Sequence, residues 1–113
     1  MLENIGASIE HYMTLLSARQ KLVASNIANA DTPGYKTKDI DFRGEFESQL
    51  AGLDPTAVEV SGLKTKNDGN NVDMDREARL LAENALRFSV ATNLARSEIQ
   101  TLKEAIQGGT TSS

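Results

Sequence analysis

Residues 74–106 read MDREARLLAENALRFSVATNLARSEIQTLKEAI and carry apolar side chains at alternating spacings of four and three residues. Such a seven-residue repeat stays on one stripe of a helix when that helix winds gently around a partner. At about 1.5 Å per residue, the segment predicts a helical rod of roughly 50 Å, which a small domain cannot enclose. We therefore expect a surface that another helix covers. We call this row the seam, in which Thr92 is the one polar member: Met74, Ala78, Leu81, Ala85, Phe88, Thr92, Ala95, Ile99, Leu102 and Ile106.

The predicted C-terminal helix spans residues 73–107. Asp73 or Asp75 can cap its beginning, where a carboxylate also suits the positive end of the helix dipole. Gly108 and Gly109 follow the last seam residue, and glycine is the usual residue just beyond a helix. Residues 108–113 are therefore expected to form a flexible tail.

A second long helix is predicted within residues 1–31. Pro33 disfavours helical geometry at the residue before it, so the helix should end near Asp31. Pro33 and Gly34 suit the two central positions of a type II turn, in which Gly34 takes a positive φ. The apolar residues of this helix form one stripe with a slight rotation, which comprises Leu2, Ile5, Ile9, Tyr12, Met13, Leu16, Val23, Ile27 and Ala30.

Residues 32–72 predict an irregular connector. Phe42, Phe46 and Leu50 lie four residues apart and favour a short helix over residues 43–51. The segment from Val58 to Val60 alternates and suggests a brief strand, and a short β-hairpin with a turn at residues 68–69 is one option. The expected fold is mainly α, with two long antiparallel terminal helices in a coiled-coil-like hairpin joined by this connector.

Composition excludes several classes of protein. The chain has 113 residues, which is enough for one domain, and a net charge of −4 with no basic face for nucleic acid or an anionic membrane. It has no cysteine, so disulfides and thiolate metal sites are excluded. No apolar run is long enough to span a membrane, and the first residues lack the pattern of a cleavable signal peptide.

No catalytic, metal or cofactor site is predicted. His11 is the only histidine and has no nucleophile beside it, so a structural position is the better interpretation. The carboxylates of Asp39, Asp41, Glu45 and Glu47 alternate with lysine and arginine and lack the spacing of a calcium loop. We interpret them as a solvated loop of mixed charge. The scattered glycines do not form a phosphate-binding loop.

Residues 24–35, ASNIANADTPGY, form the most specific stretch of the chain. Its alanines and serine let neighbouring helices approach closely, while Asn26 and Asn29 can hydrogen-bond across a helix interface or to loop backbone. On composition alone, a capped helix followed by a turn is the simpler interpretation. The stretch closely resembles the N-terminal motif of bacterial flagellar rod and hook proteins. We call it the junction motif; the residues expected to act in assembly are Ser25, Asn26, Ile27, Ala28, Asn29, Ala30, Thr32, Pro33, Gly34 and Tyr35.

The resemblance extends to residues 36–42, 69–75 and 82–88, which are most similar to the proximal rod subunits of that family. It implies a structural subunit without enzymatic activity, which is exported through the flagellar type III apparatus without a cleaved signal peptide. Such subunits assemble helically into the periplasmic drive shaft of the basal body. The implied partners are copies of the chain, other rod subunits, the rod-adaptor protein, and components of the MS ring and export gate.

Two alternatives stay open at this point: a paralogous rod subunit, and a soluble coiled-coil adaptor that binds a single partner helix. The adaptor would form a discrete dimer or heterodimer, whereas a rod subunit would form a poorly ordered monomer or larger species. A two-helix hairpin with one shared apolar stripe buries little apolar area. The free energy gained by that burial is small beside the conformational entropy lost when its residues become ordered. We therefore expect the isolated chain to be partly disordered at both ends and its fold to be completed by assembly.

Overall fold

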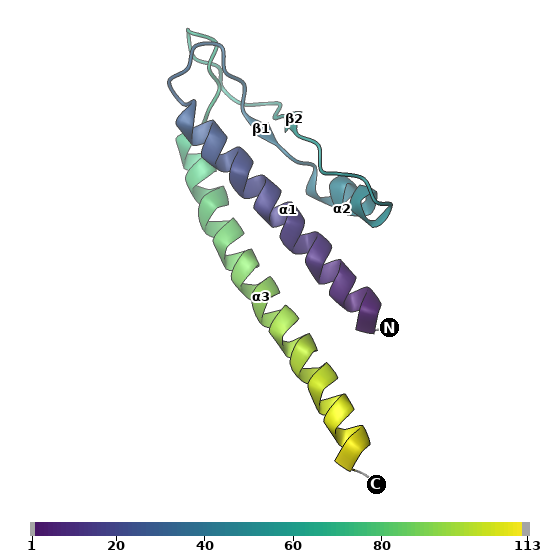
Figure 1. The fold of residues 1–113 in the computed structure, drawn as a ribbon. Helices are drawn as coiled ribbons and strands as arrows, with labels where there is room; N and C mark the ends of the chain where they lie inside the picture. Colours follow the sequence, from purple (N-terminus) through teal and green to yellow (C-terminus); the bar gives the residue numbers. More distant parts are fainter. Residues whose placement is uncertain (1, 112–113) are drawn as a thin grey trace.

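The computed structural model describes residues 2–111 and is a rod of 73 × 27 × 18 Å. Helix α1 (Leu2–Ala28) and helix α3 (Met74–Thr111) run antiparallel along the rod and meet at one end, where the connector joins them (Figure 1). The connector contains strand β1 (Lys38–Asp39), helix α2 (Phe42–Leu50) and strand β2 (Val58–Glu59). The predicted mainly-α fold with two long antiparallel terminal helices is therefore confirmed.

Helix α3 runs beyond its predicted end. It continues through Gly108 to Thr111, so the prediction that Gly108–Gly109 stops the helix was wrong. A glycine inside a helix costs only about 1 kcal/mol relative to alanine, so glycine alone does not end a helix. Residues 112–113 of the predicted tail lie outside the described residues. The described part of the chain includes no helix that is both long and apolar enough to cross a membrane.

The connector contains a small antiparallel sheet, in which Lys38 pairs with Glu59 and Asp39 with Val58. The loop between the two strands contains α2, which begins one residue before the predicted short helix. Residues 68–69 therefore do not join the strands of this sheet. They lie in a separate turn, in which Gly69 N–H donates to the carbonyl oxygen of Lys66. Strand β1 was not predicted, because two charged residues show no alternation of apolar and polar side chains.

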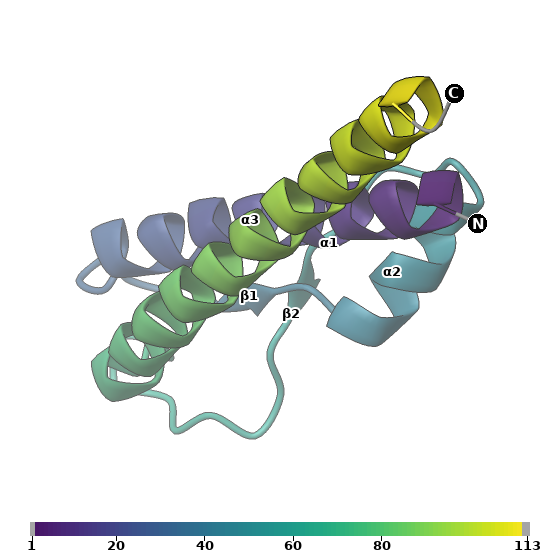
Figure 2. The same cartoon turned by 90° about the horizontal axis from the view of Figure 1, so that it is seen from below.

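Helix α2 packs against α1 on a different side from α3. The rings of Tyr12 and Phe42 meet edge to face with centroids 5.4 Å apart, and the Arg19 guanidinium lies over the Phe42 ring, 5.4 Å from its centroid. An edge-to-face pair of aromatic rings and a cation over an aromatic face are both favourable contacts. Seen from below, α3 crosses α1 obliquely, and α2 lies across α1 from the C-terminal half of α3 (Figure 2).

The buried core is small and rich in polar residues. Leu16 and Val23 of the predicted α1 stripe are fully buried, whereas Ile5 is 46% exposed. The other buried apolar residues are Leu15, Ile40, Val72 and Ala91, and the buried polar residues are Asn26, Thr37, Asp39, Asn70, Asn71, Glu77 and Asn84.

Helix α3 faces α1 with a row beside the seam. This row consists of Glu77, Asn84 and Ala91, which are spaced seven residues apart and buried. The side-chain amide of Asn84 donates to the carbonyl oxygen of Leu16 at 2.8 Å and to the Gln20 side chain at 3.1 Å. Polar residues buried between two helices fix the register of the helices more than they stabilise the contact. The seam itself is therefore left largely uncovered within the chain.

Candidate functional site

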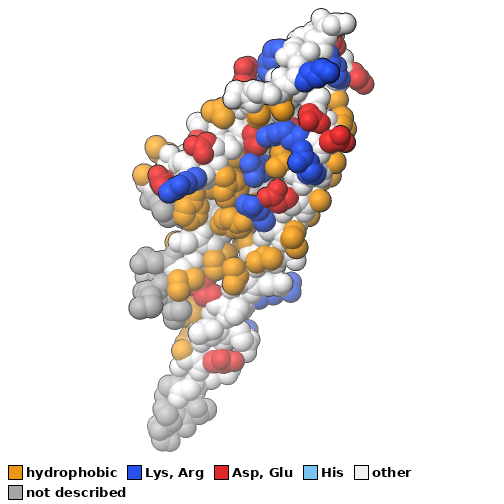
Figure 3. Space-filling model, turned by 180° about the vertical axis from the view of Figure 1, so that it is seen from behind, with side chains coloured by type: hydrophobic (Ala, Val, Ile, Leu, Met, Phe, Trp, Pro, Cys, Tyr) orange, Lys and Arg blue, Asp and Glu red, His pale blue; other side chains and the backbone are white. Residues whose placement is uncertain are grey.

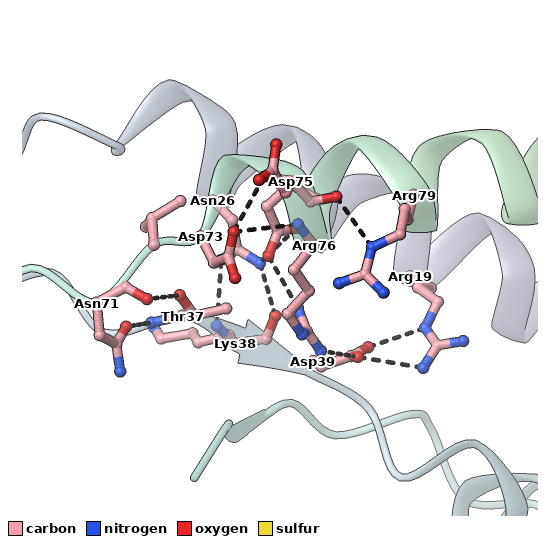
Figure 4. Close-up of polar contacts among 12 residues, drawn as sticks. Arg19, Asn26, Thr37, Lys38, Asp39, Asn71, Asp73, Asp75, Arg76 and Arg79 are labelled. Carbon is pink, nitrogen blue, oxygen red and sulfur yellow. Dashed lines mark hydrogen bonds and ion pairs between the residues drawn. The ribbon is translucent and has the colours of Figure 1, made fainter. Parts of the chain in front are cut away.

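Asn26 is the centre of the junction between the two long helices. Its side chain is completely buried. The side-chain oxygen Oδ1 accepts hydrogen bonds from the Tyr35 hydroxyl at 2.9 Å and from Lys38 N–H at 3.1 Å. Its amide nitrogen donates to the Lys38 carbonyl oxygen at 2.8 Å and to Glu77 Oε2 at 3.2 Å (Figure 4). Asn26 thus joins α1, β1 and α3 in a single set of bonds. Because these bonds are all internal, Asn26 shapes the junction rather than contacting a neighbouring molecule.

The turn after α1 has the predicted geometry. Gly34 has a φ of 76°, and Tyr35 N–H donates to the carbonyl oxygen of Thr32 at 3.2 Å, closing the turn. A residue near the end of the connector forms hydrogen bonds to this turn. Asn70 donates from its side-chain amide to the carbonyl oxygens of Asn29 and Thr32 at 2.9 and 2.8 Å. The two ends of the connector are thereby fixed to each other directly beside the helix junction.

The remaining junction-motif residues divide into an inner and an outer set. Asn29 bonds locally, donating to the Ser25 carbonyl oxygen at 2.8 Å and accepting from the Thr32 hydroxyl at 3.0 Å. Ile27, Asn29, Ala30 and Tyr35 are partly buried, whereas Ser25, Ala28, Thr32, Pro33 and Gly34 are exposed. The structure therefore uses part of the motif internally and leaves a surface of small residues at the end of the rod.

Asp39 is the hub of a second polar cluster. Arg19 donates to its two carboxylate oxygens from Nε at 2.9 Å and from Nη2 at 3.1 Å, and Arg76 Nη2 lies 2.6 Å from Oδ2. Arg76 also pairs with the buried carboxylate of Glu77 at 2.8 Å. The cluster ties β1 to both long helices (Figure 4). The interpretation of Asp39 as part of a solvated loop was wrong, because it is only 7% exposed.

The pKa of Asp39 lies below its ordinary value. Burial alone would raise this pKa, because it disfavours the charged form. The hydrogen bonds from Arg19, the backbone N–H of Ile40 and Arg76, together with the charge of Arg19, outweigh burial and lower the pKa. Asp39 is therefore a charged anchor of the fold at neutral pH.

Several residues of this site were not singled out by sequence reasoning. Arg19 and Arg76 are charged residues within the long helices, and each could have suggested a partner of opposite charge. The side chain of Asn71 accepts from Thr37 N–H at 2.6 Å, a contact between residues 34 positions apart that no local pattern indicates. The prediction that Asp73 caps α3 is consistent with the structure, since its carboxylate accepts from Asp75 N–H at 3.0 Å.

The seam residues lie along one side of α3. Two adjoining hollows form a groove beside α1: α1 residues between Gly6 and Lys21 form one wall, and the seam residues Leu81, Ala85, Phe88, Ala95 and Ile99 form the other. The six large seam residues, from Met74 to Ile106, remain between 39% and 68% exposed. Ala78 and Ala85 are exposed, Ala95 is half-buried, and the Thr92 hydroxyl donates to its own helix at the Phe88 carbonyl oxygen. Hydrophobic side chains also gather along the middle of the face shown in Figure 3.

Within residues 2–111, no group of three or more histidine, cysteine, aspartate or glutamate side chains is placed to hold a metal ion. His11 lies half-buried on α1. The open grooves beside the helices are lined mainly by apolar side chains. This arrangement suits packing against other helices.

Comparison with known proteins points to one family. The family profile described as "Flagella basal body rod protein" matches residues 13–36, which include Arg19 and the junction motif. The chain is 30% identical to flagellar basal body rod protein FlgB of Salmonella typhimurium and of Escherichia coli, over 96% of this chain and 99% of each relative. It is 33% identical to FlgB of Borrelia hermsii, over 74% of this chain and 81% of that relative.

The relatives differ from this chain in length. The alignment with the Salmonella protein extends over 137 positions, more than the 113 residues of this chain, so that protein carries residues within the aligned region that this chain lacks. These relatives are all named FlgB, which favours FlgB over the paralogous rod subunit considered above.

Proposed function

The chain belongs to the FlgB family of flagellar basal body rod proteins, and on that premise we propose that it is a proximal rod subunit that assembles helically by covering the seam of α3 with helices of neighbouring subunits. The family is structural and non-enzymatic, and its members are components of the flagellar basal body. Membership in a rod family implies assembly with other basal body components.

One observation carries the proposal: the seam is apolar over most of the length of α3 and uncovered within the chain. Its six large side chains are each at least 39% exposed. Contiguous apolar surface of this kind marks a protein interface in a soluble chain. If the seam packs against a different surface of the neighbouring copy, the contact is heterologous and propagates as a helix.

The finer details of the proposal come from family resemblance. The partners would be other rod subunits, the rod-adaptor protein, and components of the MS ring and export gate. The subunit would lie in the periplasmic part of the basal body after type III export without a cleaved signal peptide. The cysteine-free composition is compatible with passage into an oxidising space.

The seam can be tested by placing a charge on it. We expect Phe88→Asp and Leu102→Asp each to block rod assembly and swimming, because a carboxylate in a dry helix interface costs several kcal/mol. The measurement is swimming in soft agar, together with electron microscopy of isolated basal bodies in which this chain carries a label.

Asn93→Asp is the matched control. Asn93 is exposed on α3 away from the seam, so this variant should assemble and swim normally. Normal swimming of both seam variants would contradict the proposal, as would an isolated chain that forms only a discrete dimer with one soluble partner helix.

A further inference from the structure

Helix α3 has a second exposed apolar row, on the other side of its contact with α1 from the seam. Leu86, Val90 and Leu94 lie four residues apart and are 66%, 51% and 54% exposed. A helix that is apolar on both sides of one contact is built to be enclosed by several neighbours. The seam therefore does not account for all the apolar surface of α3.

The second row forms one wall of a groove, which we call the α2-side groove. Val90, Ala91 and Leu94 of α3 face Phe46 of α2 across it, and α1 lies between them as the floor, with Ser8, Ile9 and Tyr12. The cavity holds about 330 Å³ and is almost wholly apolar. The small side chain of Ala91 leaves room for a helix to approach.

The end of α3 carries apolar side chains that stay exposed, although Ile99 also lines the groove between the seam and α1. At Gly6, near its beginning, α1 lies against Glu98 of α3, and the end of α3 extends past the first turn of α1 (Figure 1). The end of α3 from Ile99 onward, which we call the projecting end, carries Ile99, Leu102 and Ile106, which are 56%, 39% and 68% exposed. Their spacing of i, i+3 and i+7 is the anchor pattern of a helix that binds in an apolar groove.

These two surfaces cannot meet within one chain. Leu94 and Leu102 are eight residues apart on one continuous helix, which separates them by about 12 Å along its axis. A straight helix cannot bring its own end back onto its middle. The surfaces can meet only between two copies.

We propose that the α2-side groove binds the projecting end of α3 from a second copy of this chain. The proposal rests on the assembly proposed above and names the partner and the surface for one of its contacts. The projecting end supplies three apolar anchors, and the groove supplies aromatic and branched walls around Ala91. Because the groove and the projecting end lie at different heights of the rod, each contact displaces the next subunit along the axis.

The absence of native cysteine permits a direct cross-linking test. Two versions of the chain with different epitope tags are co-expressed in cells that lack the native copy, one with Leu94→Cys and the other with Leu102→Cys. A disulfide requires the two Cα atoms to lie within about 7 Å of each other. A disulfide-linked dimer of the two tagged chains therefore shows that the groove of one chain contacts the projecting end of the other. Val90→Cys replaces Leu94→Cys in a parallel arm, in case the first variant folds poorly.

The control pair is Leu94→Cys with Gln100→Cys, because Gln100 is exposed on the same projecting end and lies outside the anchor row. In motile cells, we expect several-fold more mixed dimer from a groove and Leu102 pair than from the control, because only the anchor row brings its cysteine within disulfide distance of the groove. Equal yields in motile cells would overturn the groove contact and leave the rod function standing. Cross-linking of Leu94→Cys to a different rod protein would also overturn it. Failure of the rod function itself would show separately, as normal swimming of the seam variants.

Discussion

Asp39 fastens the connector to both long helices. Its carboxylate is held between Arg19 of α1 and Arg76 of α3, and the backbone N–H of Ile40 donates to it at 2.7 Å. Removing the Asp39 carboxylate leaves Arg19 without its partner and Arg76 with Glu77 alone, and such a loss costs more than the ion pair itself contributes. Asn26 has the matching role for the turn, through its bonds to β1 and Glu77.

We expect Asp39→Asn to lower the free energy of unfolding by about 2–3 kcal/mol. Loss of one partner from a fully buried pair costs about 3–5 kcal/mol, and the cost here is smaller because the side chains of Arg19 and Arg76 keep 16% and 18% exposure. Urea denaturation followed by circular dichroism measures the change. Asp41→Asn is the control, since Asp41 is exposed and makes no side-chain cap to α2. Equal losses in the two variants would show that the cluster does not hold the connector.

The same residue predicts a dependence on pH. The pKa of Asp39 in the folded chain lies below its ordinary value of 3.8, so the unfolded chain binds this proton more tightly. Its contribution is therefore complete above the unfolded pKa and is lost as the pH falls through the folded pKa. The difference in unfolding free energy between the native chain and Asp39→Asn should be constant at neutral pH and should shrink once the pH falls below about 5. A difference that grows on acidification would contradict this assignment.

Among the elements, the turn after α1 and the turn at residues 66–70 hold each other in place. Gly34 N–H donates to the carbonyl oxygen of Asp68 at 2.8 Å. A Cβ on Gly69 would lie 3.3 Å from the Cα of Gly34, so the two backbones approach as closely as glycine permits. This contact fixes where α3 begins relative to the end of α1.

Gly69→Ala should therefore destabilise the chain more than Gly52→Ala. Both glycines have a φ of 86°, and an alanine in that conformation costs about 1–2 kcal/mol at either position. Nothing lies within 4 Å of a Cβ at Gly52, whereas the contact with Gly34 adds about 1 kcal/mol or more at Gly69. Chemical denaturation of the two variants compares them directly. Equal destabilisation would mean that the two turns do not depend on each other.

The elements also show what the sequence could predict. Periodicity and the Pro33–Gly34 pair predicted both long helices, the short helix and the turn, because each depends on local geometry. The pairing of β1 with β2 and the burial of Asp39 depend on contacts between residues distant in sequence, which no local pattern records. The row of α3 that faces α1 was not identified because Glu77 and Asn84 are polar, so the apolar seam was the more conspicuous feature.

At the scale of the whole molecule, the chain is a thin rod with little interior. Its polar clusters gather at the junction end, and the described chain leaves large apolar residues exposed along much of α3, from Met74 to Ile106. A two-helix layer buries one stripe of each helix, whereas a helix enclosed by neighbours buries two or three. We expect this molecule to gain most of its stability from contacts with other subunits.

Concentration-dependent unfolding of the purified chain tests this expectation most directly. Circular dichroism should show incomplete helix content in dilute solution, and both helix content and melting temperature should rise with protein concentration, because association stabilises the folded state by mass action. Full helix content in dilute solution, with a cooperative melt at the same temperature at every concentration, would contradict the account.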